Sequence, residues 1–293
     1  MTSPRDIPDQ AWPLFDRYVH GDLSRRGFLE QAAAFAGGPA GAAALLAALS
    51  PNFAAAQQVK PDDARLVTRR LAFPSPAGNG QVNGYLAKPA SAMGKLPAVL
   101  VVHENRGLNP HIEDIARRVA LAGYVAYAPD ALTPLGGYPG NEDDARALFA
   151  KLDPAKARAD IVAAARGLLT LADANGKLGV VGFCWGGSLS NHVATQVPEL
   201  AVAVPFYGGA PAAEDVPRIK AQLLIHYAAN DERINAAWPA YEAALKAAGV
   251  RYEAHTYPGT QHGFNNDTTP RYDAAAAQLA WERTLAAFKA ALA

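Results

Sequence analysis

The chain of 293 residues contains a single cysteine, Cys184, which excludes an internal disulfide and any metal site built from several cysteines. Its seven histidines show no HExxH pattern or other paired ligand spacing, so the sequence predicts no metal and no cofactor. Basic and acidic side chains number 27 each, leaving no net charge. Without a basic excess, the chain lacks the main source of affinity for nucleic-acid phosphates, and no nucleic-acid partner is expected.

Apolar residues make up 50% of the chain and charged residues 18%, a composition that excludes a disordered or fibrous protein. The length suits one large domain or two small ones. No internal repeat is visible, and the only biased segment is an alanine-rich stretch near the N-terminus. The composition therefore predicts a globular chain with a substantial core.

The N-terminal region reads as an export signal. Ser24–Glu30 resembles the twin-arginine motif, with Arg25 and Arg26 followed by an apolar pair, and with Glu30 where a lysine is usual. An uncharged, alanine-rich stretch follows at 31–49, and Ala54–Ala56 supplies a small-residue cleavage site. We expect residues 1–56 to form a leader read by the twin-arginine machinery. Residues 57–293 would then be the mature, periplasmic or exported domain.

Two other interpretations of this region remain open. The stretch is about long enough to span a bilayer, but glycines and Pro39 interrupt it, and alanine contributes little transfer energy. Alternatively, the segment stays attached in a cytoplasmic protein and packs as a helix on the domain. Apolar residues before the arginine pair, such as Trp12 and Phe15, favour this last interpretation.

From about residue 60, short apolar runs alternate with helical patterns. The predicted strands are Leu66–Phe73, Gln81–Lys88, Leu96–His103, Tyr124–Ala128, Leu178–Gly182, Ala201–Phe206, Gln222–Tyr227 and Tyr252–Tyr257. The predicted helices are Pro110–Ala122, 141–150, 154–173, 187–196, 237–248 and 271–291. This alternation predicts an α/β fold with a mostly parallel central sheet and helices on both faces. Reactive groups of such sheets lie where the strands end.

Cys184 lies in the segment Gly182–Gly187, between a predicted strand and a predicted helix. The sequence GFCWGG fits a nucleophile elbow, in which glycines permit a strained turn and close contact with neighbouring elements. The N-terminus of the following helix favours a thiolate, because its partial positive charge lowers the thiol pKa. The alternative is a buried, unreactive cysteine.

An acid and a histidine follow in the order typical of this kind of site. Asp231 comes after the strand Gln222–Tyr227, and His262 comes after Tyr252–Tyr257. His262 would take the thiol proton and later return one to the leaving group, while Asp231 would orient and stabilise the ring. The alternatives are a loop-capping Asp231, with Glu232 as a rival acid, and a surface role for His262. The other downstream histidines, His192, His226 and His255, lie inside predicted elements and are expected to pack or to face solvent.

The loop after the strand Leu96–His103 carries further candidates. The N–H groups of Asn105 and Trp185 are the predicted oxyanion donors. Glu104 is a candidate partner of the resting thiol, because a carboxylate at the end of a buried strand is costly unless it is used or paired. Arg106 is a candidate for binding an anionic group of the substrate. The alternative is that Glu104 and Arg106 form a structural ion pair.

Over about residues 60–293 the chain resembles the dienelactone hydrolase family of the α/β-hydrolase superfamily. The resemblance rests on the cysteine elbow, the Glu104 loop, Tyr127–Asp130, the aspartate after a strand, and the loop His262–Phe264. It implies a Cys–His–Asp triad, and a glutamate that partners the thiol and moves away when substrate binds. These roles would fall on Cys184, His262, Asp231 and Glu104.

The chain departs from the family at two positions. The family's substrate carboxylate is held by two arginines, one shortly after the Ala-Pro-Asp segment and one four residues after the histidine. Here those stretches read Ala131–Pro134 and Gly263–Asn266, without arginine. Dienelactone itself is therefore in doubt as a substrate, whereas hydrolysis of a small ester or lactone through an acyl-enzyme is the expected reaction. The alternatives are a broad carboxylesterase or thioesterase, and a non-catalytic binding protein or thiol sensor.

Overall fold

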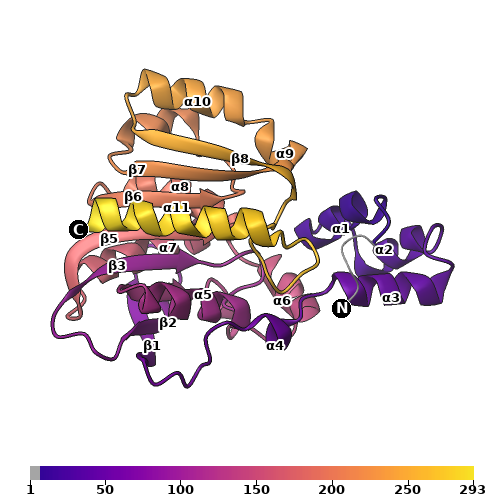
Figure 1. Cartoon of the computed structure of the whole chain (residues 1–293), viewed down its shortest axis with the longest axis horizontal. Coiled ribbons are helices and arrows are strands. Elements are labelled where there is room, and N and C mark those ends of the chain that lie inside the picture. Colours follow the sequence, from indigo (N-terminus) through magenta and orange to yellow (C-terminus); the bar gives the residue numbers. More distant parts are fainter. Residues whose placement is uncertain (1–6) are drawn as a thin grey trace.

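The computed structural model describes residues 7–293 as an eight-stranded sheet covered by helices, with a helical segment at one end (Figure 1). The strands are β1 (Leu66–Ser75), β2 (Gly80–Pro89), β3 (Leu96–Val102), β4 (Val125–Pro129), β5 (Ala174–Phe183), β6 (Leu200–Phe206), β7 (Gln222–Asn230) and β8 (Tyr252–Gln261). The helices of the domain are α5 (Pro110–Leu121), α6 (Glu142–Phe149), α7 (Pro154–Leu169), α8 (Trp185–Gln196), α9 (Glu232–Asn235), α10 (Trp238–Ala247) and α11 (Ala274–Leu292), with 3₁₀ turns η2 (Thr133–Leu135) and η3 (Ala213–Arg218).

The sheet order is β1-β2-β4-β3-β5-β6-β7-β8. The hairpin β1–β2 lies at one edge, β2 pairs antiparallel with β4, and every later pairing is parallel. This confirms the predicted α/β class and the mostly parallel sheet. The parallel strands bring the ends of β3, β5, β7 and β8 to one edge, and that edge holds the candidate residues.

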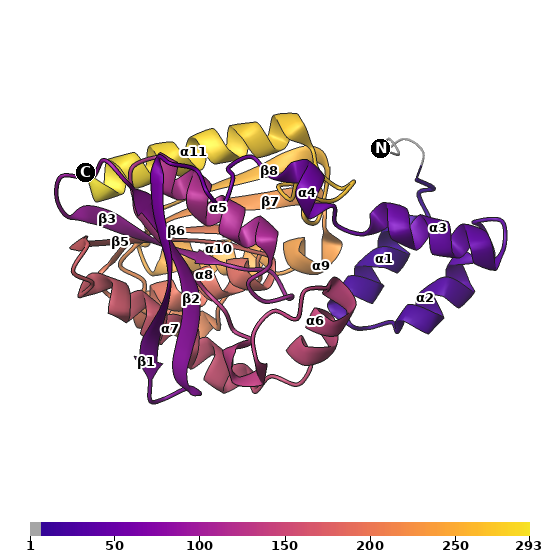
Figure 2. The same cartoon turned by 90° about the horizontal axis from the view of Figure 1, so that it is seen from below.

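The two faces of the sheet build separate cores, because successive strand residues point in opposite directions. On β3, Leu100 and Val102 join a core covered by α7, α8 and α10, whereas Val99 and Val101 join a core covered by α5 and α11. Figure 2 shows α5 and α11 on one side of the sheet and α7 and α8 on the other. Burial on both faces explains why these strands read as continuous apolar runs.

The predicted elements are all present, with different boundaries at several ends. β5 begins four residues earlier than predicted, at Ala174, and β8 continues to Gln261. Helix α8 begins at Trp185, directly after the elbow cysteine, rather than at residue 187. The short helix α9 was not predicted; the side chain of Asp231 caps it by accepting a hydrogen bond from the N–H of Ile234 at 3.4 Å.

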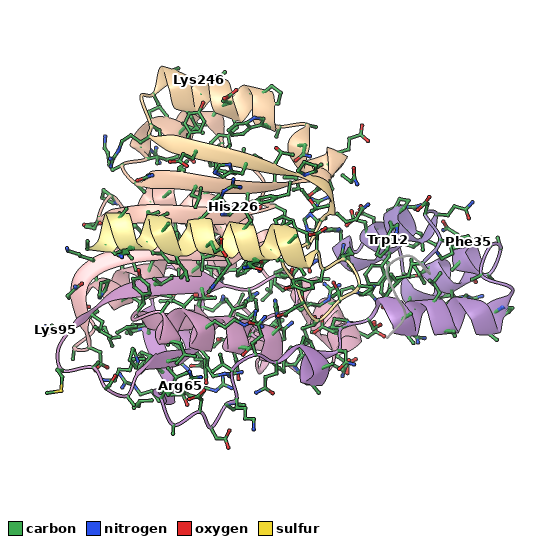
Figure 3. All side chains as sticks on the ribbon, in the orientation of Figure 1. Trp12, Phe35, Arg65, Lys95, His226 and Lys246 are labelled. Atoms are coloured by element: carbon green, nitrogen blue, oxygen red, sulfur yellow. The ribbon has the colours of Figure 1, made fainter. Side chains whose placement is uncertain are left out.

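The N-terminal arm, as we call residues 7–56, forms four helices: α1 (Ala11–His20), α2 (Arg25–Ala32), α3 (Pro39–Leu49) and α4 (Phe53–Ala56). Helices α1 to α3 enclose a small core of their own, in which Phe28 and Leu49 are fully buried. Trp12 and Phe35 lie in this helical unit, apart from His226 in the sheet (Figure 3). Figure 1 shows the arm beyond the end of the sheet, next to α6.

The alanine-rich stretch is not one continuous helix. Helices α2 and α3 are separated by a turn at Gly37 and Gly38, both of which have positive φ. By length and composition alone, Pro39–Ala56 is long and apolar enough to cross a membrane, with a mean hydropathy of 1.2. Signal sequences near an N-terminus share these properties, so the finding does not separate the interpretations of the arm.

Candidate active site

Cys184 occupies a strained turn between β5 and α8, with φ 57° and ψ −112°. A Cβ atom at Gly182 would lie 2.0 Å from the carbonyl oxygen of Gly186, and one at Gly186 would lie 2.2 Å from that of Val102. Only glycine fits at both positions, because these contacts are to rigid backbone atoms. The predicted elbow is confirmed as a backbone conformation, and it holds the cysteine at the end of β5.

Asp231 and His262 follow the ends of β7 and β8 and meet there. The Nδ1 atom of His262 lies 2.5 Å from Oδ2 of Asp231, and both side chains are almost completely buried. Oδ1 of Asp231 also caps α9, so the capping role and the contact with His262 coexist on one carboxylate. The rival acid Glu232 is exposed. The geometry therefore pairs the imidazole with Asp231.

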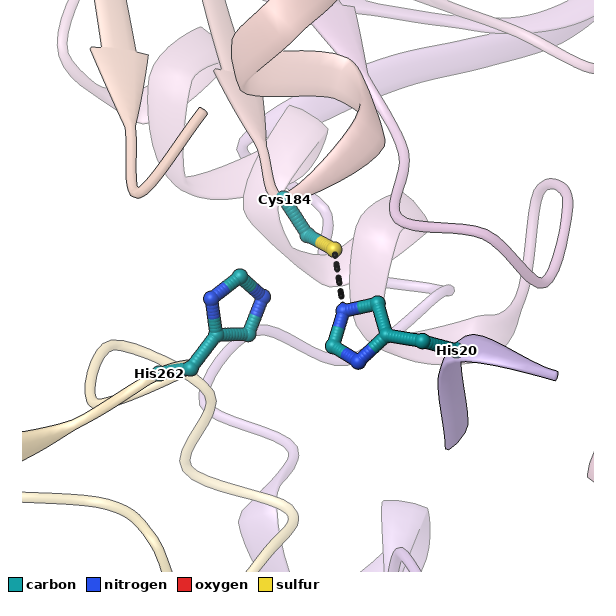
Figure 4. A group of neighbouring side chains, drawn as sticks. All are labelled: His20, Cys184 and His262. Atoms are coloured by element: carbon teal, nitrogen blue, oxygen red, sulfur yellow. Dashed lines mark hydrogen bonds between the residues drawn. The ribbon is translucent and has the colours of Figure 1, made fainter. Parts of the chain in front are cut away.

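Two imidazole rings face the thiol of Cys184 (Figure 4). One belongs to His262, and the other to His20 of the N-terminal arm. Nε2 of His20 lies 3.7 Å from Sγ, and the Sγ atom and one nitrogen of each ring all lie within 4.8 Å of one another. The rings meet edge to face, with centroids 5.0 Å apart. His20 lies in the segment that the sequence predicts to be a leader, and no motif marks it as a site residue.

These neighbours set the charge state of the thiol. Burial raises the pKa of Cys184, but the adjacent rings of His262 and His20 outweigh this effect and lower it to about 6. Burial lowers the pKa of His262, whereas the Cys184 thiolate and the hydrogen bond to Asp231 raise it to about 9. Between these values the favoured state is a thiolate beside an imidazolium.

Sγ, His20 and His262 also form the group of side chains in residues 7–293 whose donor atoms converge closely enough to hold a metal ion. A guanidinium nitrogen of Arg233 lies 2.9 Å from Nε2 of His20. A fixed positive charge at this position disfavours a cation there. The same atoms suit acyl transfer, because one sulfur and one paired imidazole are what that chemistry needs.

Glu104 reaches the pocket but contacts Asn266 rather than the thiol. The Nδ2 atom of Asn266 donates to Oε2 of Glu104 at 2.9 Å. Asn266 is the residue four positions after His262, where the family pattern has an arginine. Within residues 7–293 no hydrogen bond joins Glu104 to Cys184 and no ion pair joins it to Arg106. The assignment of Glu104 as the thiol partner stays a prediction.

Arg106 is buried against the end of helix α1. Its guanidinium donates to the carbonyl oxygens of Asn105 at 2.8 Å and Val19 at 2.9 Å, and it lies 3.6 Å from the carboxylate of Glu142. The Asn105 side chain donates to the same Val19 oxygen at 2.8 Å. Arg106 still lines the pocket. These contacts show a link to the arm that the sequence did not predict.

The backbone N–H groups of Asn105 and Trp185 have no hydrogen-bond acceptor in the described chain. The Asn105 loop is shaped by Asp130, whose carboxylate accepts from the N–H of Leu108 at 3.2 Å and that of Leu132 at 3.0 Å. Trp185 is the first residue of helix α8 and directly follows Cys184. Free N–H groups beside the elbow cysteine are what an oxyanion hole would require, and both assignments stay predictions.

The other candidate histidines do not join the site. His226 is fully buried in β7, where Tyr257 and Thr284 contact its two ring nitrogens at 2.9 Å and 3.3 Å. His192 and His255 are partly exposed on α8 and β8. All three pack or face solvent, as their positions inside predicted elements indicate.

A small cavity of about 70 Å³ lies above Cys184. The domain contributes His262, Glu104 and Arg271 to its wall, and the arm contributes Val19 and His20. Further lining residues from the arm are Phe15, Tyr18, Ser50 and Pro51. Arg271 forms an ion pair with Asp16 of the arm at 3.4 Å. No sequence motif marks this arginine as a residue of the site.

The strained turn at Cys184, followed by an acid and a histidine at the ends of later strands of a mostly parallel sheet, is the arrangement of an α/β-hydrolase. The model of the dienelactone hydrolase family matches residues 82–292, and the chain belongs to that family. It is therefore a hydrolase. A second family model, described as YqhI-like, matches residues 1–37, the beginning of the chain and much of the arm.

Individual relatives agree with this placement. A protein of Escherichia coli named "Putative carboxymethylenebutenolidase" is 34% identical over 244 residues, covering 78% of this chain and 89% of its own length. Another, named "Putative hydrolase fragment YghX", is 58% identical over 113 residues, covering 39% of this chain and 97% of the fragment. The crystal structure of a "Putative Dienelactone Hydrolase" from Klebsiella pneumoniae superposes with a TM-score of 0.68 at 30% identity, covering 76% of this chain and 98% of that one.

Proposed function

We propose that this hydrolase cleaves small esters or lactones through a triad of Cys184, His262 and Asp231. The observation that carries the proposal is the contact of His262 Nδ1 with Asp231 at 2.5 Å, with the same ring facing the sulfur at the elbow. Family membership and the name of the Escherichia coli relative support ester or lactone chemistry.

The reaction proceeds in two halves. The thiolate of Cys184 attacks the substrate carbonyl, and the negative oxygen of the tetrahedral intermediate rests on the N–H groups of Trp185 and Asn105. The imidazolium of His262 gives its proton to the leaving alkoxide, which departs as the C–O bond breaks. His262 then takes a proton from water, the water attacks the thioester, and the acid product leaves as the thiolate re-forms.

A broad carboxylesterase or thioesterase would use the same residues and differ only in substrate. A thiol sensor would keep the fold without turnover, and the pairing of Asp231 with His262 argues against it. The test is hydrolysis of p-nitrophenyl acetate by the wild type, Cys184→Ser and Cys184→Ala, followed by a panel of lactones, esters and thioesters. Loss of activity in Cys184→Ala supports the triad. Reversible oxidation of Cys184 without turnover in the wild type would favour the sensor.

We also propose that Arg25 and Arg26 direct export through the twin-arginine machinery. Both side chains are more than half exposed at the start of α2, which supports their recognition in the folded chain. Twin-arginine export of a folded hydrolase does not itself require that the arm be removed. Cleavage after Ala56, which the sequence predicts, is therefore a separate question.

A further inference from the structure

The end of helix α1 is fixed to the catalytic edge by hydrogen bonds from the domain. A helix leaves its last carbonyl groups without partners inside the helix. Here the carbonyl of Tyr18 accepts from Arg146 at 2.9 Å, and that of Val19 accepts from Asn105 and Arg106. Cationic donors at a helix C-terminus also favour its negative end. The domain thus provides a site shaped to receive this helix.

His20, the last residue of α1, is held in place from several directions. Its Nδ1 atom lies 2.8 Å from the backbone oxygen of Asp16 and 3.3 Å from the carboxylate of the same residue. Arg271 of the domain pairs with that carboxylate. Arg233 lies beside Nε2, and because this nitrogen makes one hydrogen bond at a time, the guanidinium competes with the sulfur for it. The ring of His20 is therefore held by its own aspartate, Asp16, with Nε2 facing the sulfur. The ring of His262 is held in a similar way by Asp231.

The arm also limits the space beside the nucleophile. Val19 and His20 form one wall of the cavity, and Cys184 and His262 form another. A volume of about 70 Å³ accommodates about five water-sized groups. This room beside the sulfur favours a short acyl chain over a long one, in a cavity that is partly open to solvent.

We propose that the N-terminal arm is a working wall of the active site, in which His20 positions the Cys184 sulfur and Val19 restricts the substrate to short acyl groups. This inference rests on the proposed function, since it assumes that Cys184 is the nucleophile. The substrate class becomes esters or lactones whose acyl part has only a few carbon atoms. The arm acts as part of the enzyme rather than as a leader segment that is cleaved off.

The test of positioning uses His20→Ala and His20→Gln in the full chain, with His192→Ala as the matched control. We expect His20→Ala to lower kcat for p-nitrophenyl acetate about tenfold, the order expected for losing a hydrogen bond to a charged group. The rate of Cys184 alkylation by iodoacetamide should fall as well, and His20→Gln should recover part of both rates. Unchanged rates, or faster hydrolysis of every ester after removal of the ring, would overturn this role.

The test of size uses Val19→Ala, with the exposed Val67→Ala as the matched control. The ratio of kcat/KM for p-nitrophenyl octanoate to that for the acetate should rise severalfold in Val19→Ala and stay at the wild-type value in Val67→Ala. A ratio equal to that of the wild type would overturn the arm's role in selectivity. Failure of the proposed function looks different: Cys184→Ala would then retain wild-type hydrolysis, whatever the arm variants do.

Discussion

Nε2 of His20 lies 3.7 Å from Sγ of Cys184, although 164 residues separate the two along the chain. The contact joins a helix outside the hydrolase domain to the atom that we propose as the nucleophile. The arm supplies part of the pocket wall, so the chemistry of this site depends on a region with its own small core.

Replacing the nucleophile should remove ester hydrolysis. Cys184→Ala should lower kcat for p-nitrophenyl acetate by at least about 10³-fold, because it removes the sulfur that forms the acyl-enzyme. Adding His262→Ala to this variant should cost little more, since members of a triad act as a unit. Initial rates under saturating substrate measure both effects. Near-normal turnover by Cys184→Ala would rule out the mechanism.

Asp231 should affect catalysis indirectly, by orienting the imidazole ring of His262. His262→Ala should lower kcat by about 10²–10⁴-fold, because it removes the group that moves the proton. Asp231→Asn should cost less, since the ring remains but loses the carboxylate 2.5 Å away that orients it. Glu232→Gln, a change at the exposed neighbour, serves as the control. Equal losses in Asp231→Asn and Glu232→Gln would contradict the pairing.

The pH profile of kcat/KM should be bell-shaped. Neighbouring imidazoles lower the pKa of Cys184 to about 6, so kcat/KM should rise as pH increases through that value and the thiolate forms. The pKa of His262 is raised to about 9, so the rate should fall above it as the ring loses the proton that the leaving group needs. Because the groups are coupled, the two limbs report the pair. Alkylation by iodoacetamide should follow the lower limb, whereas a rise only near the pKa of an ordinary thiol would contradict the charge state.

Substitution of Arg106 separates two possible roles of this residue, binding of the substrate and support of the arm. The sequence predicts that Arg106→Ala raises KM for carboxylate-bearing lactones and spares neutral esters. The hydrogen bond to Val19 adds a second effect, because its loss should loosen α1 and reduce activity on both substrate types while lowering the melting temperature. We expect the common loss to dominate. Arg65→Ala, at an exposed ion pair, is the control, and a loss confined to anionic substrates would favour a carboxylate-binding role.

Export can be separated from catalysis. Replacing Arg25 and Arg26 by lysine should keep the chain in the cytoplasm with its hydrolase activity intact, because neither side chain lines the pocket. Cell fractionation followed by mass spectrometry of the native N-terminus gives the location and the cleavage site. The sequence predicts cleavage after Ala56, whereas the contacts of His20 and Val19 favour an exported chain that keeps the arm. A cytoplasmic wild-type protein would contradict export without touching the hydrolase assignment.

The sequence was sufficient to predict the sheet and the elbow but not the arm's place in the site. Buried strands such as Leu96–Val102 have a local pattern, since both faces are covered. The elbow also has one, because glycines stand at fixed positions around Cys184, although the contact that requires Gly186 is with Val102 of a distant strand. His20 carries no such pattern, because its role depends on packing between distant segments. The contact of Asn266 with Glu104 could not be predicted either, because it also joins segments that are distant in the sequence.

The most direct test of the account is to trap the acyl-enzyme. Wild-type protein mixed with p-nitrophenyl acetate and quenched in acid within the first turnover should release a burst of about one p-nitrophenol per active site. Mass spectrometry should then find one acetyl group on Cys184, the only cysteine of the chain, as a thioester that hydroxylamine removes. Hydrolysis without a burst, or an acetyl group on any other residue, would contradict the central claim that Cys184 is the nucleophile.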